Sequence, residues 1–374
     1  MHMVAEGKRL KSLDALRGAD MLLIMGLSPL MAALCRALGC GGSWFERQFH
    51  HAEWNGLFIQ DTIFPLFLFL AGVSFPFSCA KSADLGLSRG SVARKALRRA
   101  LLLFLLGLVY NDVLKLGLSN VVWGSVLARI GIAWFFAALV YLCLPVKARV
   151  ALAVAVLLGY WAAMVAFVAP DYPAALPLSP EGNISGWLDR TILPGKLTVP
   201  GLYSNQGVLS TLPAVVTALI GMFVGDYVRR SGDTGGRKAA MLLAGAVCLA
   251  AAGLVVAYGF GAWSMPINKK LWSTSFTLVV GGYSVALFAL FYWVIDVKGF
   301  QKWTFFFRVI GINSITIYMA RKIIPFRDIS LFFLGGAASL LPAAWAEVLV
   351  MAGSLAVCWL FLLFLYRKNV FLKI

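Results

Sequence analysis

The chain has 374 residues, of which 61% are hydrophobic and only 13% are charged, and its mean hydropathy is +0.84. A soluble domain normally carries about 25% charged residues, so this chain could not cover its own surface with polar groups, and lipid must cover most of it. The net charge of +17 would suit nucleic-acid binding. However, the basic residues lie in short segments between apolar runs, and no soluble domain is available to gather them on one face. The composition therefore predicts a membrane protein that binds no nucleic acid.

Apolar runs long enough to cross a bilayer, which takes roughly 20 residues, recur along the whole chain. They predict an all-α fold, a polytopic membrane helix bundle of about ten transmembrane helices that forms a single integral-membrane domain over residues 1–374. A further apolar stretch, 329–342, is short and contains Gly and Pro, so we expect an interfacial or re-entrant segment there. The ten expected helices lie near residues 14–38, 58–80, 97–117, 121–144, 149–169, 208–228, 239–260, 272–295, 305–323 and 344–366.

The distribution of Lys and Arg predicts how these helices are oriented. Most of the 33 basic residues, including Lys8, Arg9, Lys373 and those of segment 89–99, fall on one side of this layout. Because Lys and Arg are retained on the cytoplasmic side, we expect both termini in the cytoplasm, an even number of spans, and a multi-pass protein of the cell inner membrane. The outer side then carries the loop 170–207, which is long enough to favour a functional role.

A second outer loop contains the residues best suited to acid–base chemistry. His50 and His51 are adjacent there and are followed by Trp54 and Asn55, and Asp61 comes shortly after. Histidine can take and return a proton near neutral pH and can also accept an acyl group. An interfacial histidine pair beside an aromatic anchor would explain the same residues without chemistry. Asp61, at the top of a spanning helix, is costly unless it is solvated, paired or facing a polar cavity.

Two later segments are polar where lipid-facing helices are normally apolar. They contribute Asn268, Lys269 and Trp272 at the outer end of one predicted span, and Asn313 in the middle of another. Hydrogen bonding between helices would be enough to accommodate each of them. Their occurrence in the same chain as the histidine loop favours a polar cavity on the outer side.

The inner face offers a possible phosphate site. Asp14 and Arg17 lie three residues apart at the start of the first helix, where a helix cap and a favourable first-turn charge would explain them. Alternatively, Arg17 binds phosphate together with Arg94 and Arg98 of the basic segment.

Other charged and sulfur-containing residues give weaker signals. Arg129 lies deep in a predicted helix, where an ion pair with Asp112 or a bound ligand would each account for it. The six cysteines are scattered through apolar runs. They form no CxxC or Cys/His spacing, so we expect no metal site.

Six segments of the chain, in this order, resemble the heparan-α-glucosaminide N-acetyltransferase family and in particular its bacterial, NagX-like members. The resemblance runs over residues 8–374, and the block H-A-x-W-N-G that begins at His51 is its specific part. The six segments are SLDALRG, HAEWNGLFIQDTIFPLFLFLAGVSFPFS, SVLARIGI, PINKKLWSTSF, DVKGF and GINSITIY.

This resemblance implies a transmembrane N-acetyltransferase that moves an acetyl group from cytoplasmic acetyl-CoA to the amine of a glucosamine-type sugar on the extracytoplasmic side. It makes His51, and not His50, the active histidine. It also implies a possible homodimer. The chain departs from the lysosomal enzyme at Ser28, where that enzyme carries an asparagine implicated in catalysis. We expect His51, Asn55 and Asp61 to be catalytic, Asp14, Arg17, Arg94, Arg98 and Arg129 to bind acetyl-CoA, and Trp54, Asn268, Lys269, Trp272 and Asn313 to bind the acceptor.

Several alternatives stay open at this point. His51 could act as a base in direct transfer, or it could carry the acetyl group in a two-step relay. The acceptor could be free glucosamine, a terminal glucosaminide of a glycan or an amino sugar of the cell wall. A secondary transporter of sugars or related solutes would also use intramembrane charges. However, the sequence lacks the paired, interrupted helices that many transporters place in corresponding halves.

Overall fold

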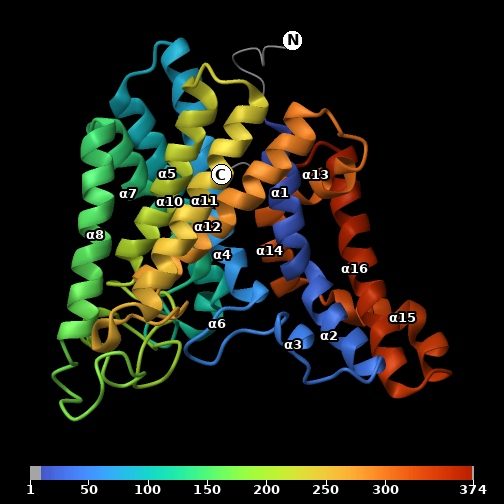
Figure 1. Ribbon diagram of the computed structural model, residues 1–374. Coiled ribbons are helices and arrows are strands. Elements are labelled where there is room, and N and C mark those ends of the chain that lie inside the picture. Colours follow the sequence, from blue (N-terminus) through green and yellow to red (C-terminus); the bar gives the residue numbers. More distant parts are fainter. Residues whose placement is uncertain (1–9, 373–374) are drawn as a thin grey trace.

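The computed structural model describes residues 10–372, and within them helices are the only regular structure apart from isolated bridges (Figure 1). This confirms the all-α prediction. Eight helical stretches are long and apolar enough to cross a membrane, as expected of a multi-pass membrane protein. In chain order the helices are α1 (Lys11–Leu22), η1 (Leu23–Leu27), α2 (Ser28–Ala37), α3 (Trp44–Arg47), α4 (Ile59–Asp84), α5 (Arg89–Tyr110), α6 (Val113–Leu116), α7 (Val126–Cys143), α8 (Val146–Ala166), α9 (Ile184–Ile192), α10 (Thr211–Arg230), α11 (Gly235–Tyr258), η2 (Gly261–Trp263), α12 (Thr274–Phe291), η3 (Tyr292–Val297), α13 (Thr304–Ile312), α14 (Ser314–Ile323), α15 (Phe326–Ser339) and α16 (Ala343–Arg367).

The total of ten spans stays a prediction, because two of the expected spans are not among these eight helical stretches. Helix α5 is long enough, but its first half carries the basic segment 89–99. The expected helix 305–323 is divided at Asn313 into α13 and α14. The first expected helix, 14–38, is also interrupted, since η1 is a π-helical turn in which Gly26 has a φ of 153°. That conformation is open to glycine and strained for other residues, and it kinks the helix.

Two predicted helix starts differ from the structure by five residues or more, and the stretch expected at 329–342 takes a regular form. Helix α5 begins at Arg89 instead of 97, because the Ser88 hydroxyl caps it by accepting a hydrogen bond from the Ser91 amide at 3.2 Å, and long basic side chains can extend from a helix into the headgroup region. Helix α7 begins at 126 instead of 121, after the capping residue Ser125. The stretch expected as interfacial or re-entrant is the short helix α15, which packs on α16 and is shorter than a span requires.

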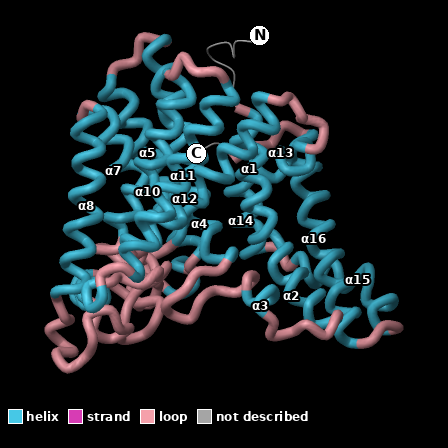
Figure 2. The backbone as a smooth tube through the Cα atoms, in the orientation of Figure 1, coloured by secondary structure: helices cyan, strands magenta, loops and turns pink. Residues whose placement is uncertain are grey.

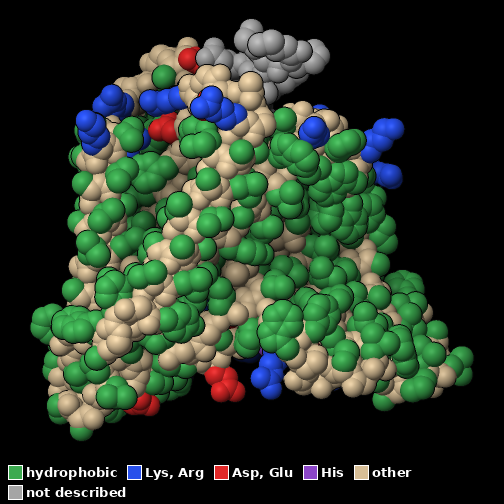
Figure 3. Space-filling model, in the orientation of Figure 1, with side chains coloured by type: hydrophobic (Ala, Val, Ile, Leu, Met, Phe, Trp, Pro, Cys, Tyr) green, Lys and Arg blue, Asp and Glu red, His purple; other side chains and the backbone are tan. Residues whose placement is uncertain are grey.

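The ends of the bundle differ in charge and in loop content. Figure 3 shows Lys and Arg side chains gathered at one end of the visible face, opposite the end where the longest loops lie together below α8 in Figure 2. This asymmetry agrees with the predicted separation of basic residues, while the assignment of the basic end to the cytoplasm stays a prediction. Lys8, Arg9 and Lys373, which that prediction used, lie outside the described residues.

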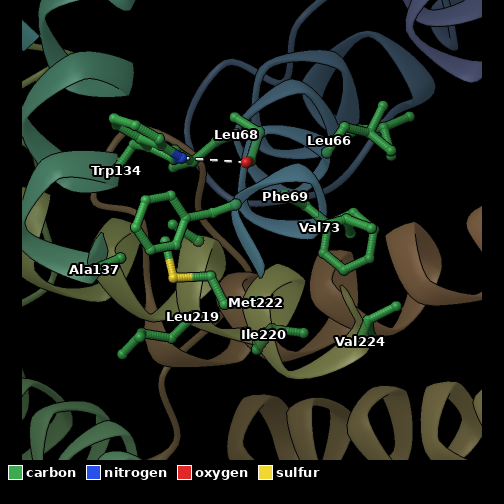
Figure 4. Close-up of a cluster of buried hydrophobic side chains, with 14 of the residues drawn as sticks. Leu66, Leu68, Phe69, Val73, Trp134, Ala137, Leu219, Ile220, Met222 and Val224 are labelled. Carbon is green, nitrogen blue, oxygen red and sulfur yellow. Dashed lines mark hydrogen bonds between the residues drawn. The ribbon is translucent and has the colours of Figure 1, made fainter. Parts of the chain in front are cut away.

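Helix α4 runs through the centre of the bundle and packs against α10, α7, α12 and α1. Figure 4 shows side chains of α4, α7 and α10 meeting in the core, where the Trp134 indole donates to the Ala71 carbonyl at 3.1 Å. The backbones of α4 and α10 approach closely because small residues face each other. A Cβ atom on Gly221 would lie 2.1 Å from the Phe69 carbonyl oxygen, and one on Gly72 would lie 2.2 Å from that of Ala218. Small residues at this spacing are typical of tightly packed membrane helices.

We expect Gly221→Ala to destabilise the protein, because the new methyl group forces α10 away from the α4 backbone. Overpacking of this kind costs about 1–3 kcal/mol, occasionally more. Gly245→Ala is the matched control, since a Cβ atom at Gly245 meets nothing within 4 Å. Thermal unfolding in the same detergent measures both variants. A Gly221→Ala protein as stable as the Gly245→Ala protein would contradict this packing.

Candidate functional site

Asp61 and His51 form a pair at the beginning of α4. The Asp61 carboxylate is 1% exposed, and its Oδ1 lies 2.8 Å from His51 Nδ1. Its Oδ2 accepts hydrogen bonds from the backbone amides of Ala52 and Phe58, both at 3.2 Å. These amides belong to the segment that leads into the helix, so the carboxylate both fastens that segment and orients the imidazole. The His51 side chain is 54% exposed, which leaves the rest of the ring open to a reactant.

Lys269 joins this pair from the loop that precedes α12. Its Nζ lies 3.0 Å from His51 Nδ1 and 3.4 Å from Asp61 Oδ1. Burial lowers the pKa of Lys269, and the negative charge of Asp61 offsets part of that effect. The neighbouring Asn268 amide donates to Asn55 Oδ1 at 3.1 Å. Two of the residues predicted for the outer site, His51 and Lys269, therefore contact Asp61 directly, and two more, Asn55 and Asn268, contact each other beside them. Their roles stay predictions.

Ser28, at which the sequence departs from the lysosomal enzyme, contributes to the same region. It begins α2 and is buried, and its hydroxyl donates to the side-chain oxygen of Gln60 at 2.6 Å. Gln60 immediately precedes Asp61 in α4. Gln60 thus brings a side-chain amide next to Ser28, which itself offers only a hydroxyl. The sequence analysis did not predict this amide.

The loop 170–207, expected on the outer side, reaches Trp54. It contains helix α9, which the sequence analysis did not predict. The buried Asp189 carboxylate of this helix accepts hydrogen bonds from the backbone amides of Val208, at 2.8 Å, and Ser204, at 3.1 Å. The Trp54 indole donates to the Leu178 carbonyl at 2.9 Å, and its ring lies 5.0 Å from that of Tyr203. Trp54, which follows His51 by three residues, therefore forms an aromatic wall that packs on the buried Tyr203, and Tyr203 was not predicted.

Arg129 and Trp272 occupy places that differ from those expected. Arg129 is buried near the start of α7, where it donates to the Gly207 carbonyl at 3.1 Å and its guanidinium lies 5.2 Å from the Trp272 ring. It does not pair with Asp112, whose carboxylate binds Lys322 at 2.7 Å. Arg129 therefore lies away from the basic residues of α5 that were expected to bind acetyl-CoA with it, and its own role in that binding stays a prediction. The Trp272 side chain is fully buried and cannot touch an acceptor here.

The opposite end of α4 borders a basic cavity of about 240 Å³ between α4, α5 and α7. Its lining includes Ser74, Ser78, Ser82, Lys95, Arg99 and Trp134. The three serines recur every fourth residue and so share one face of α4. The Arg99 guanidinium lies 4.6 Å from the Trp134 ring, and its Nε has no hydrogen-bond partner among the described residues.

The predicted phosphate-binding residues are only partly at this cavity. Arg94 and Arg98 are exposed and are not among the residues that line the cavity, whereas Lys95 and Arg99 of the same helix do line it. Arg17 reaches the cavity wall, since its guanidinium hydrogen-bonds to the Ser74 hydroxyl and to the Leu70 carbonyl, the latter at 3.2 Å. Asp14 lies 3.9 Å from Arg17.

Between the two ends lies a mostly apolar region with isolated polar atoms. Ile63, Phe64 and Phe67 of α4 line a small apolar pocket there. The buried Asp20 Oδ2 has no hydrogen-bond partner among the described residues, and neither do the two side-chain polar atoms of Asn313. Unpaired polar atoms at such depth are costly, and a ligand or water can satisfy them. Asn313 thus lies inside the bundle, below the outer surface where the acceptor was expected.

This arrangement defines a multi-pass membrane protein with a histidine–carboxylate–lysine group at one end of a central helix and a basic cavity at the other. Within residues 10–372 no group of three or more His, Cys, Asp or Glu could hold a metal ion. A family model described as the catalytic region of heparan-alpha-glucosaminide N-acetyltransferase matches residues 9–251. The chain therefore belongs to this family, which confirms the resemblance seen in the sequence segments.

Two curated relatives carry the same name. The Homo sapiens protein is 27% identical over 368 residues, which cover 84% of this chain and 53% of the human protein. The Mus musculus protein is 25% identical over 372 residues, which cover 86% of this chain and 54% of the mouse protein. The chain thus spans about half the length of the curated relatives it matches.

Proposed function

We propose that this protein is a transmembrane N-acetyltransferase of the cell inner membrane. It takes an acetyl group from acetyl-CoA on the cytoplasmic side and passes it to the amine of a glucosamine-type sugar on the extracytoplasmic side. One observation carries the proposal: α4 places Asp61, bonded to His51, at one end and the serine face of a basic cavity at the other. Membership of an acetyltransferase family supports the reaction class.

The basic cavity suits the nucleotide end of CoA. Lys95 and Arg99 line it and Arg17 contacts its wall, so phosphate groups would meet two kinds of cation, the fork of arginine and the point charge of lysine. The serine hydroxyls of α4 add neutral donors. The pantetheine arm is thin enough to enter the bundle, and the unpaired atoms of Asp20 and Asn313 offer hydrogen bonds to its amides.

At the outer end, His51 supplies the proton chemistry. The sugar amine is an ammonium in water and must first lose a proton to the solvent. The neutral amine then attacks the thioester carbon, so that a C–N bond forms and the C–S bond breaks. The second proton leaves the amine nitrogen and ends on the CoA thiol, with His51 as the base. In a relay, His51 would first take the acetyl group and then yield it to the amine.

The acceptor binds beside Trp54. Its half-buried ring packs on the buried Tyr203, with the ring centroids 5.0 Å apart, and offers an apolar surface to a sugar ring. The Lys270 ammonium lies 5.9 Å from the Trp54 ring, and its side chain donates to the Glu53 carbonyl. This wall accepts an amino sugar of several kinds, so we propose the substrate class and leave the exact sugar open.

The test uses purified protein in vesicles with labelled acetyl-CoA supplied on one side and a panel of amino sugars on the other. We expect labelled N-acetyl sugar to appear only when donor and acceptor are on opposite sides. Movement of unmodified sugar across the membrane, without acetylation, would replace the proposal with the transporter alternative. Protein that binds acetyl-CoA but acetylates no amine in the panel would also overturn it.

We expect Arg99→Gln to weaken acetyl-CoA binding about 10- to 100-fold, because the loss of one charge-assisted phosphate contact costs about 1.5–3 kcal/mol. Arg98→Gln is the matched control: it removes the same charge from the next residue, which is exposed on the other face of α5. Calorimetry with acetyl-CoA measures both variants. Equal loss in the two variants would mean that only the overall charge of α5 matters and that the cavity is not the site.

A further inference from the structure

Two charged groups, the Asp61 carboxylate and the Lys269 ammonium, compete for one ring nitrogen of His51 at the outer site. His51 Nδ1 lies 2.8 Å from Asp61 Oδ1 and 3.0 Å from Lys269 Nζ. A neutral imidazole nitrogen either carries a proton and donates, or lacks one and accepts. It therefore cannot donate to Asp61 and accept from Lys269 at the same time. Lys269 has a second partner in the same carboxylate, since its Nζ lies 3.4 Å from Asp61 Oδ1.

The loop holds Lys269 in this position firmly. The backbone amide of Asn268 donates to the Ser273 hydroxyl at 3.0 Å, and the side-chain oxygen of Asn268 accepts from the backbone amide of Leu271 at 2.9 Å. Trp272 has a φ of 51°, which is a strained conformation for so bulky a residue. Its indole donates to the Thr217 hydroxyl at 3.2 Å. A loop that keeps such a conformation is strongly constrained by its surroundings. The fold therefore holds the backbone of Lys269 where its side chain can contact His51.

The other charged groups nearby face away from the His51 ring. His50 lies 3.7 Å from Glu46, which also binds Arg36 at 3.1 Å. Lys270 donates to the Glu53 carbonyl and lies over Trp54. The carboxylate that contacts the ring within the described residues is that of Asp61, and the cation that contacts it is Lys269.

We propose that Lys269 acts on His51 and not on the acceptor sugar. Its ammonium donates a hydrogen bond to Asp61, and the Nδ1–H group of His51 donates to the same carboxylate. The free lone pair of the ring is then on Nε2, which becomes the reacting nitrogen. As a like charge beside the ring, the Lys269 ammonium also opposes protonation of His51 and so keeps the ring able to act as a base. Lys269 is thus a positioning residue. The choice of Nε2 rests on the proposed function, whereas the effect on ring protonation does not.

The sign of the effect follows from the charges. If Lys269 is replaced by Met, Asp61 still stabilises a protonated ring while the opposing cation is gone. The ring then holds its proton more readily, because the nearby like charge that opposed protonation has been removed. The acidic limb of the pH profile of kcat/KM moves to higher pH, so the variant loses more activity at pH 6 than at pH 8.

The experiment is a pH titration of the labelled imidazoles by NMR, which is tractable because the chain has three histidines. The His51 signal is assigned by its loss in His51→Ala. We expect the midpoint of the His51 titration to rise in Lys269→Met and in Lys269→Gln and to return in Lys269→Arg. Lys270→Met, which removes the same charge from the adjacent residue, should move it much less.

An unchanged midpoint in a folded Lys269→Met or Lys269→Gln protein would overturn the proposal. A raised KM for the sugar with an unmoved acidic limb would likewise do so, because it would make Lys269 an acceptor contact. The titration needs no transfer activity. If the unmodified protein acetylates no amine, the proposed function fails, while the titration still decides what Lys269 does to His51.

Discussion

His51→Ala is expected to reduce acetyl transfer about 10²- to 10⁴-fold, the usual range for the loss of a general base. The ring is half-exposed and fixed at Nδ1 by the buried Asp61, so truncation removes the proton acceptor and leaves the helix intact. Acetyl-CoA binding and thermal stability should be unchanged, because the basic cavity is at the other end of α4. Initial rates with glucosamine and saturating acetyl-CoA measure the effect.

His50→Ala is the matched control for this prediction. His50 is as exposed as His51 but lies 3.7 Å from Glu46 and outside the Asp61 group, so its loss should be mild. Incubation with labelled acetyl-CoA alone separates the two routes, since a relay leaves label on His51 and direct transfer leaves none. A His51→Ala protein that acetylates glucosamine at nearly the unmodified rate would refute the catalytic assignment by either route.

Asp61→Asn is expected to reduce transfer to a similar extent, about 10²- to 10⁴-fold, by a different cause. The shape of the side chain is kept, but its amide can donate to His51 Nδ1. The ring proton is then driven to Nε2, which loses its lone pair for chemistry. The loss of nearly all activity on the corresponding Asp→Asn change in serine proteases has the same origin. Rates and acetyl-CoA affinity should be measured together, because only the rate is expected to fall.

Asp84→Asn provides the control on the same helix, since Asp84 is exposed at the far end of α4. It removes the same charge without touching His51, and its rate should stay close to that of the unmodified protein. If Asp61→Asn folds normally and retains full activity, the carboxylate serves only to fasten the segment before α4 through the amides of Ala52 and Phe58.

The sequence could suggest which residues of the outer site lie close together, because they fall in short segments with a distinctive order, while their roles stay predictions. His51, Asn55 and Asp61 are close together in the chain, and Asn268 and Lys269 lie in a second polar segment, so two loops on one side were enough to suggest a common cavity. The contacts between them, such as Asn268 with Asn55 at 3.1 Å, require the structure. So does the burial of Trp272, which depends on α4 and α7 packing around it.

The inner site was predicted less well for a reason that the sequence does contain. The buried positions Val92, Ala96, Ala100 and Leu103 of α5 follow helical spacing. Extending the helix back to Arg89 places Arg99 beside this stripe and Arg98 away from it. Placing the helix start at 97 hid this periodicity. Arg129 was beyond such reasoning, because Gly207, the partner that fixes its place, is distant in the chain.

The close contact of α4 with α10 has a consequence for how this protein can work. Carbonyl oxygens of one helix fill the space above the glycines of the other, so neither helix can slide or tilt without collision. The interval between the inner mouth and the outer imidazole is then a fixed length, roughly 20 Å along α4 from Ser74 to Asp61. A carrier that alternately opens to each side has no need of a long substrate, whereas a rigid conduit does. If the protein acts as proposed, the donor molecule itself must span this interval, and a compact acetyl donor would stop at the entrance however reactive its acetyl group.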